Sequence, residues 1–156
     1  MRPDGGEGPL PIGSRAPDVV GETPTGAEIR LSALLGRPVV VYFYPKDGTP
    51  GCTTQACGFR DAWARYQTQG VAIFGVSSDT AERHRSFQAD HKLPFPLVAD
   101  ESGDVAKSYG VPKQLWGYSR ITFLVGRDGK IAKLWPSVDP GVHADDVLAA
   151  VAALPR

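Results

Sequence analysis

Two runs of consecutive apolar residues stand out in the pattern of hydrophobic and polar positions. Residues 38–45 (PVVVYFYP) and 71–79 (VAIFGVSSD) are rich in β-branched and aromatic side chains, which is typical of strands buried on both faces. Between them, Phe59, Trp63 and Tyr66 follow the i, i+4, i+7 spacing of one helix face. Strand, helix and strand at this spacing predict a βαβ unit with parallel strands and a right-handed crossover.

The rest of the chain predicts shorter elements around this unit. Near its start we expect a short strand and one helical turn, capped by Ser32. Two β-runs around a Gly-Arg-Asp-Gly turn predict an antiparallel hairpin over residues 120–135. The remaining predicted elements are helices, over residues 80 or 81 to about 91, about 102–109, and the C-terminal segment that contains Val147, Leu148, Val151 and Leu154.

Together these elements predict an α/β fold of the thioredoxin-like type, with a central mixed β-sheet flanked by helices. The sheet has a parallel βαβ half and a hairpin half, and a closing helix follows. A length of 156 residues suits one domain with a sizeable core. We expect residues 1–11, which are rich in Gly and Pro, to form a flexible N-terminal tail, and residues 12–156 to form the domain.

Charge and composition narrow the function classes. Lys plus Arg and Asp plus Glu each number 17, so there is no electrostatic case for binding nucleic acid or an anionic membrane. No apolar segment approaches the roughly 18 residues of a membrane span, and the N-terminal residues lack the apolar core of a secretory signal. A cytoplasmic protein is the simplest interpretation, and there a cysteine pair is more often catalytic or metal-binding than structural.

Both cysteines lie in the stretch FYPKDGTPGCTTQACGF, residues 43–59. Threonine is a good N-cap and proline is favoured at the first helical position, so Thr49 and Pro50 predict a helix start. Cys52 is then the third helical residue, near unpaired backbone N–H groups and the positive end of the helix dipole. Both favour the thiolate, which is the nucleophilic form of cysteine. The local sequence therefore predicts that Cys52 is a nucleophile.

Cys57 lies five residues further along the predicted helix, about 140° around its axis and about 7.5 Å along it. The implied Cα–Cα distance to Cys52 is about 8.7 Å, above the limit of ~7 Å for a disulfide. Either the two thiols never pair, or pairing requires the first turns of the helix to unwind. Gly51 and Gly58 make this segment easier to remodel.

This stretch resembles the peroxiredoxins, and specifically the bacterioferritin comigratory protein subfamily, whose plant members are called peroxiredoxin Q. The motif P-x-x-x-T-x-x-C corresponds to Pro45, Thr49 and Cys52, and a second cysteine five residues later marks the subfamily. The segment SRITFLV resembles the one that supplies the active-site arginine of the family, which is Arg120 in this chain. The resemblance covers nearly the whole sequence.

The resemblance implies a thiol-dependent peroxidase that reduces hydrogen peroxide and organic (alkyl) hydroperoxides. Cys52 would attack the peroxide and become a sulfenic acid, and Cys57 would resolve it as an intramolecular disulfide. Arg120 would stabilise the thiolate and the leaving alkoxide. Thr49 would orient the peroxide, and Pro45 would shield the sulfur from water.

The resemblance also implies the partners of the reaction. A thioredoxin-type reductant would recycle the disulfide, and no metal, haem or flavin cofactor is required. Because both cysteines belong to one chain, we expect a monomer. Residues 111–119 (VPKQLWGYS) form a shorter loop than in many members and carry Trp116 and Tyr118 at the expected pocket rim.

Several other interpretations of these residues remain open from the sequence. The cysteines could be inert core residues, and Arg120 could be a surface charge. A copper chaperone would use two thiolates and a histidine, but such sites need closer cysteines and no histidine stands in an obvious position. We expect His84, His91 and His143 to be solvated. A general disulfide reductase needs C-x-x-C at the helix start, whereas four residues separate the cysteines here.

Overall fold

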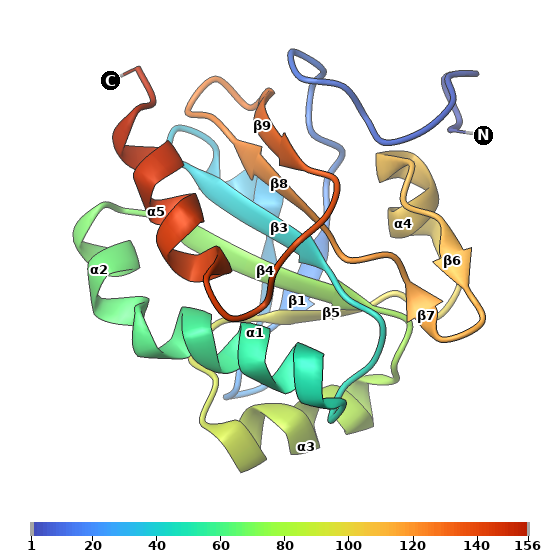
Figure 1. Ribbon diagram of the computed structural model, residues 1–156, viewed down its shortest axis with the longest axis vertical. Coiled ribbons are helices and arrows are strands. Elements are labelled where there is room, and N and C mark those ends of the chain that lie inside the picture. Colours follow the sequence, from blue (N-terminus) through green and yellow to red (C-terminus); the bar gives the residue numbers. More distant parts are fainter. Residues whose placement is uncertain (1, 156) are drawn as a thin grey trace.

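The computed structural model describes residues 2–155, which fold around a seven-stranded mixed sheet (Figure 1). The helices are α1 (Pro50–Asp61), α2 (Trp63–Thr68), α3 (Ala81–His91), α4 (Asp104–Tyr109) and α5 (His143–Ala152), with a 3-10 turn η1 (Leu31–Leu34). The strands are β1 (Val20–Glu22), β2 (Glu28–Arg30), β3 (Val39–Phe43), β4 (Ala72–Ser77), β5 (Leu97–Ala99), β6 (Lys113–Gln114), β7 (Gly117–Tyr118), β8 (Ile121–Val125) and β9 (Ile131–Trp135).

The order of strands in the large sheet is β2-β1-β5-β4-β3-β8-β9. β3, β4 and β5 are parallel neighbours, and β8 and β9 extend the sheet as an antiparallel hairpin. This arrangement confirms the predicted βαβ unit, hairpin and thioredoxin-like mixed sheet. β6 and β7 form a separate two-stranded hairpin, close to α4 in Figure 1.

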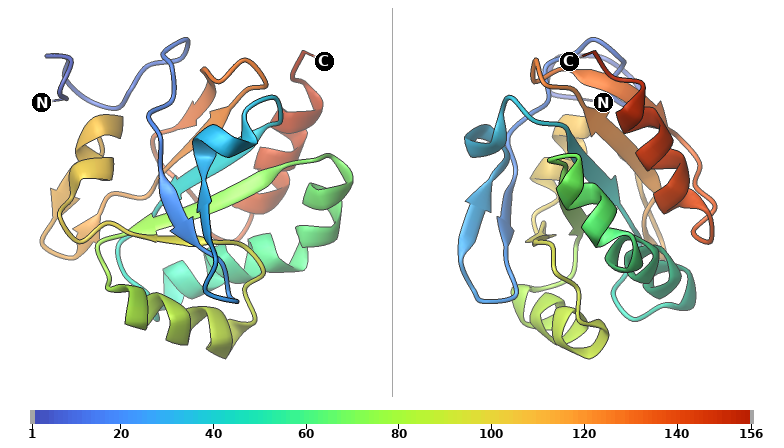
Figure 2. Two further views of the ribbon diagram at one scale, coloured as in Figure 1. Left: turned by 180° about the vertical axis from the view of Figure 1, so that it is seen from behind. Right: turned by 90° about the vertical axis from the view of Figure 1, so that its left-hand side faces the viewer.

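β3 is buried on both faces because its side chains alternate between two hydrophobic cores. Val40 and Tyr42 belong to the core beneath α1, α2 and α5. Val39, Val41 and Phe43 belong to the core beneath α4 and the N-terminal strands. The right-hand view of Figure 2 shows α2 and α5 on one side of the central strands β3 and β4, and the hairpin of β1 and β2 with η1 on the other side.

Two local predictions differ from the structure. The helix expected to run from α1 through Tyr66 is interrupted at Ala62, whose φ of −91° and ψ of 1° separate α1 from α2. The apolar face survives the break, since Phe59 and Tyr66 are fully buried. Ser32 does not cap η1, because its amide and hydroxyl both donate to the Asp18 carboxylate. No glycine, proline or other local sequence signal marks the helix break at Ala62 or the contact of Ser32 with Asp18.

The N-terminal segment is attached to the rest of the fold near residue 10. Leu10 is buried, and its backbone N–H donates to the carbonyl of Tyr109 at 2.9 Å. The flexible tail over residues 1–11 and the domain boundary at residue 12 stay predictions, and residue 1 lies outside the described residues. Over residues 2–155, none of the helices is long and apolar enough to cross a membrane.

The start of α5 buries a polar side chain in the first core. His143 is 2% exposed, its Nε2 lies 2.8 Å from the Thr122 hydroxyl, and the rings of Phe59 and Trp135 meet it edge-on. Burial lowers the pKa of His143 from 6.5 to about 4, and the nearby Arg120 guanidinium also lowers it, against the opposing effect of Asp146. His143 is therefore neutral in the folded protein at neutral pH.

His143 should make the fold acid-sensitive. Between pH 6.5 and about 4 the unfolded chain binds a proton that the folded chain does not, so the free energy of unfolding falls as the pH falls through this window. The full loss is on the order of 3 kcal/mol. The free energy of unfolding, measured by denaturant titrations at several pH values, should depend less steeply on pH for His143→Gln than for the parent. Parallel pH profiles for the two proteins would contradict this assignment.

Candidate active site

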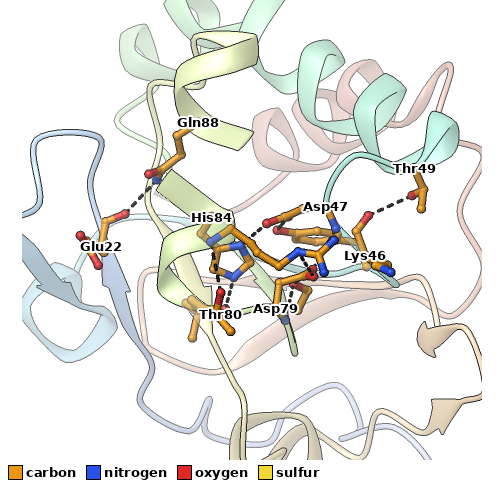
Figure 3. Close-up of polar contacts among 12 residues, drawn as sticks. Glu22, Lys46, Asp47, Thr49, Asp79, Thr80, His84 and Gln88 are labelled. Carbon is orange, nitrogen blue, oxygen red and sulfur yellow. Dashed lines mark hydrogen bonds and ion pairs between the residues drawn. The ribbon is translucent and has the colours of Figure 1, made fainter. Parts of the chain in front are cut away.

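Cys52 lies in the first turn of α1, and its side chain is 1% exposed. Thr49 is the N-cap residue and Pro50 occupies the first helical position, which confirms the predicted helix start. The Thr49 hydroxyl donates to the carbonyl of Lys46 at 2.9 Å (Figure 3), so it fixes the loop before the helix instead of capping α1. With its hydrogen engaged there, the Thr49 oxygen can still accept a hydrogen bond.

The pairing of β3 with β8 brings Arg120 to the Cys52 sulfur. Phe43 at the end of β3 lies opposite Ile121 at the start of β8, so Arg120 stands beside the segment that leads into α1. Its Nη2 donates to Cys52 Sγ at 3.5 Å. A guanidinium in this position stabilises negative charge on the sulfur.

Gln55 holds the second terminal nitrogen of the Arg120 guanidinium, Nη1. It follows Cys52 by three residues in α1 and is 1% exposed, and its Oε1 accepts from Arg120 Nη1 at 2.7 Å. Gly51 leaves room for this arrangement, because a β-carbon there would lie 3.0 Å from Arg120 Nη2. Sequence reasoning missed Gln55, and its i+3 spacing from Cys52 was the available signal.

Two buried side-chain atoms within residues 2–155 have no hydrogen-bond partner, Gln55 Nε2 and Tyr42 OH. Tyr42 belongs to the same core cluster as Cys52. Burial raises the pKa of Tyr42 well above its ordinary value, and the negative charges of Asp47 and Cys52 add to this rise. Its hydroxyl therefore stays protonated, and the surroundings of Cys52 hold hydrogen-bonding capacity beyond that of Arg120.

Pro45 is half-buried beside the hairpin of β6 and β7. Gly117 in this hairpin has a φ of 115°, and a β-carbon there would lie 2.1 Å from the Pro45 carbonyl oxygen, so only glycine permits the close approach. Tyr118 is buried and its hydroxyl donates to the Asp100 carboxylate at 2.8 Å, whereas Trp116 is 66% exposed. Of the two aromatic residues expected at the rim, Tyr118 anchors the hairpin and Trp116 faces solvent.

Cys57 is half-buried and faces α3, where its Sγ lies 4.0 Å from Nδ1 of His91. Both cysteines are free thiols, and α1 is continuous through both of them. A continuous helix keeps their Cα atoms about 8.7 Å apart, too far for a disulfide.

A buried polar cluster anchors the loop that precedes α1 (Figure 3). The Asp47 carboxylate accepts from the Tyr44 hydroxyl at 2.5 Å, and its other oxygen lies 2.5 Å from Nδ1 of His84. Nε2 of His84 lies 2.9 Å from the Val98 carbonyl and therefore carries a hydrogen. The Asp47 backbone N–H donates to Asp79 at 2.8 Å. The loop is thereby tied to α3 and to the end of β4.

The expectation of solvated histidines is wrong for His84 and His143, which are 3% and 2% exposed. The partner of His84, Asp47, lies 37 residues away in the sequence, so only the fold reveals the pair. Asp47, Asp79 and His84 also offer ligand atoms within 4.8 Å of one another. Because a cation would have to displace their mutual hydrogen bonds, the cluster is better suited to holding the loop than to binding a metal.

The geometry also bears on the alternatives left open by the sequence. Arg120 places a cation against Cys52 and thereby disfavours a soft metal ion at that sulfur. The regular helix between the cysteines disfavours a reductase that opens and closes a ready-made disulfide. What the site offers is a buried sulfur beside a fixed cation, with a second thiol held at a distance.

Comparison with known proteins gives a consistent result. The profile described as the AhpC/TSA family matches residues 12–134. The protein named peroxiredoxin Bcp from Bacillus subtilis is 38% identical over 146 residues, which cover 89% of this chain and 93% of the relative.

Solved structures are similar over nearly the same region. Peroxidoxin BcpB from Mycobacterium tuberculosis has a TM-score of 0.84 and 32% identity, covering 94% of this chain and 99% of that one. The bacterioferritin comigratory protein of Xanthomonas campestris, described for its alkyl peroxide reduction activity, has a TM-score of 0.77 and 35% identity, covering 86% and 90%.

Proposed function

This chain belongs to the AhpC/TSA family, and from that premise we propose that Cys52 is its peroxidatic cysteine and Cys57 its resolving cysteine. The activity is thiol-dependent reduction of a peroxide, as in the peroxiredoxins that it resembles. One observation carries the assignment of Cys52: its buried sulfur lies in the first turn of α1, 3.5 Å from the Arg120 guanidinium.

In the first step the Cys52 thiolate attacks one oxygen of the peroxide. The S–O bond forms as the O–O bond breaks, the sulfur becomes a sulfenic acid, and the leaving oxygen takes a proton to become water or an alcohol. Negative charge moves from the sulfur to the leaving oxygen. Arg120 is fixed by Gln55 and can stabilise that charge at both positions without reorganising.

The peroxide would be oriented by groups at the start of α1. The backbone N–H of Cys52 belongs to the first turn, whose N–H groups have no acceptor within the helix. The Thr49 hydroxyl donates to Lys46, so its oxygen is left to accept the peroxide hydrogen. Pro45 carries no backbone N–H, and its ring would limit the access of water to the sulfur.

In the second step Cys57 attacks the Cys52 sulfenic acid. The S–S bond forms, the S–O bond breaks, and water leaves. Because a regular helix holds the two residues too far apart, α1 has to unwind between them. Gly51 and Gly58 flank this segment and lower the cost of remodelling it.

A dithiol protein of the thioredoxin type would then reduce the disulfide and restore both thiols. The family supports a reductant of this class and a peroxide substrate, including hydrogen peroxide and alkyl hydroperoxides. We further propose a monomer, because one chain carries both reacting cysteines. A cytoplasmic location would supply the reducing conditions that the cycle requires.

Thiol counting should separate the roles of the two cysteines. One equivalent of hydrogen peroxide should consume both free thiols of the parent, and Cys52→Ser should abolish this loss. Cys57→Ser should reduce one equivalent and then stop as a sulfenic acid that a small thiol can trap. Thiols that survive excess peroxide for minutes, or undiminished turnover of Cys57→Ser with a thioredoxin donor, would contradict the assignment.

Replacing Gln55 tests whether the fixed position of the Arg120 guanidinium contributes to the reaction with peroxide. Gln55→Leu removes the acceptor that fixes the Arg120 guanidinium, and the second-order rate constant for peroxide should fall roughly tenfold. Thr54→Val, at the neighbouring exposed position of α1, is the control and should retain most of the rate, because it leaves the contact of Gln55 with Arg120 intact. Stopped-flow fluorescence under peroxide excess gives the rate constants. Equal rates for Gln55→Leu and the parent would refute a role for the fixed guanidinium.

A further inference from the structure

We propose that His91 is a catalytic residue of the resolving step, in which it takes the proton from the Cys57 thiol. The proposal rests on the resolving role of Cys57 in the proposed function. It starts from the contact between Cys57 Sγ and Nδ1 of His91, which are 4.0 Å apart. At that distance a neutral imidazole nitrogen can accept the thiol hydrogen.

His91 is held in place from two directions. Its ring meets the ring of Phe87 edge-on, with centroids 5.1 Å apart. Its backbone carbonyl accepts from Arg60 Nη1 at 2.7 Å, which ties the end of α3 to α1 three residues after Cys57. Lys92 then ends α3 with a left-handed backbone, φ 52° and ψ 47°. The position of His91 against Cys57 is therefore built into the packing of α3 on α1.

The ring of His91 also has a route for its proton. His91 is half-buried, and it lines a cavity of about 290 Å³ between α3 and the loop before α1. Water in this cavity can receive the proton. The charged groups around His91 are of both signs: Arg60 and Asp61, which pair at 3.0 Å on α1, Glu82, Arg83 and Asp90 on α3, Lys92 beyond it, and Asp47 in the loop.

The chemistry needs no reagent beyond those of the proposed cycle. The proton of the Cys57 S–H passes to Nδ1 of His91 and leaves a thiolate, which is the form that attacks sulfur. The thiolate forms the S–S bond with Cys52 while the S–O bond of the sulfenic acid breaks. The departing hydroxide gains a proton and becomes water, and the imidazolium releases its proton to solvent.

The order of events follows from the geometry. Cys57 contacts His91 while α1 is intact, and unwinding carries Cys57 away from α3. The proton therefore moves before or as the helix opens, and the negative sulfur moves toward the Arg120 guanidinium. His91 thus acts on the resolving step and not on the attack on peroxide.

The test separates the two steps by stopped-flow fluorescence. In His91→Gln the peroxide-dependent phase should match that of the parent. The first-order resolving phase at pH 7 should slow by roughly tenfold or more. The deficit should shrink as the pH is raised, because hydroxide in the solvent can then take the thiol proton in place of His91. Ala89→Gln, on an exposed site of the same turn of α3, is the matched control and should leave both phases unchanged.

The outcomes distinguish a failure of the role of His91 as a base from a failure of the resolving role of Cys57. A resolving phase in His91→Gln that equals the parent, or a deficit that is the same at every pH, overturns the role of His91 as a base. Cys57→Ser should have no resolving phase, and if it retains one, the proposed function of Cys57 fails instead.

A second measurement covers the case of a misfolded variant. In the Cys52→Ser background, Cys57 should react with iodoacetamide several-fold more slowly at pH 7 when His91→Gln is added. Circular dichroism of both variants establishes that the fold is intact. Equal alkylation rates would overturn the proposal.

Discussion

The continuity of α1 through both cysteines is the constraint on which the proposed cycle depends. One helix start places Cys52 in the first turn, where backbone N–H groups and Arg120 favour a negative sulfur. The same helix keeps Cys57, five residues further along, about 8.7 Å from Cys52 between Cα atoms. A disulfide is therefore impossible in the resting fold, and in the proposed cycle the protein remains a dithiol until peroxide has oxidised Cys52.

The surroundings of α1 attach both ends of the segment that has to unwind to the rest of the fold. Before the helix, the Asp47–His84 pair ties the loop to α3 within a buried cluster. Beyond Cys57, Arg60 ties α1 to the carbonyl at the end of α3. Local unwinding between these two attachments can expose the thiols to one another while the sheet remains packed, but it takes Cys52 and Ala56 out of the first core. The cost of opening is thereby confined to about two helical turns.

The sequence was most informative where a local pattern controls the structure. Thr49 and Pro50 mark the helix start, and the apolar runs mark β3 and β4, because the fixed φ of proline and the burial of apolar side chains act over a few residues. Contacts between residues that are distant in the sequence could not be predicted from it. Gln55 is 65 residues from Arg120 and Asp47 is 37 from His84. The i+3 spacing of Gln55 from Cys52 points to the site, but not to Arg120 as its partner. Arg120 was found only through the family resemblance, since a charged residue at a strand start is common.

Amide hydrogen exchange over residues 50–58 tests the central claim most directly, because it reports on the backbone hydrogen bonds of α1. The comparison is between the dithiol protein and the protein oxidised by one equivalent of peroxide, with β3 and β4 as internal references. The account predicts faster exchange between Cys52 and Cys57 in the disulfide form, and unchanged protection in the two strands. A disulfide-bonded protein whose protection over residues 50–58 equals that of the dithiol form would contradict it.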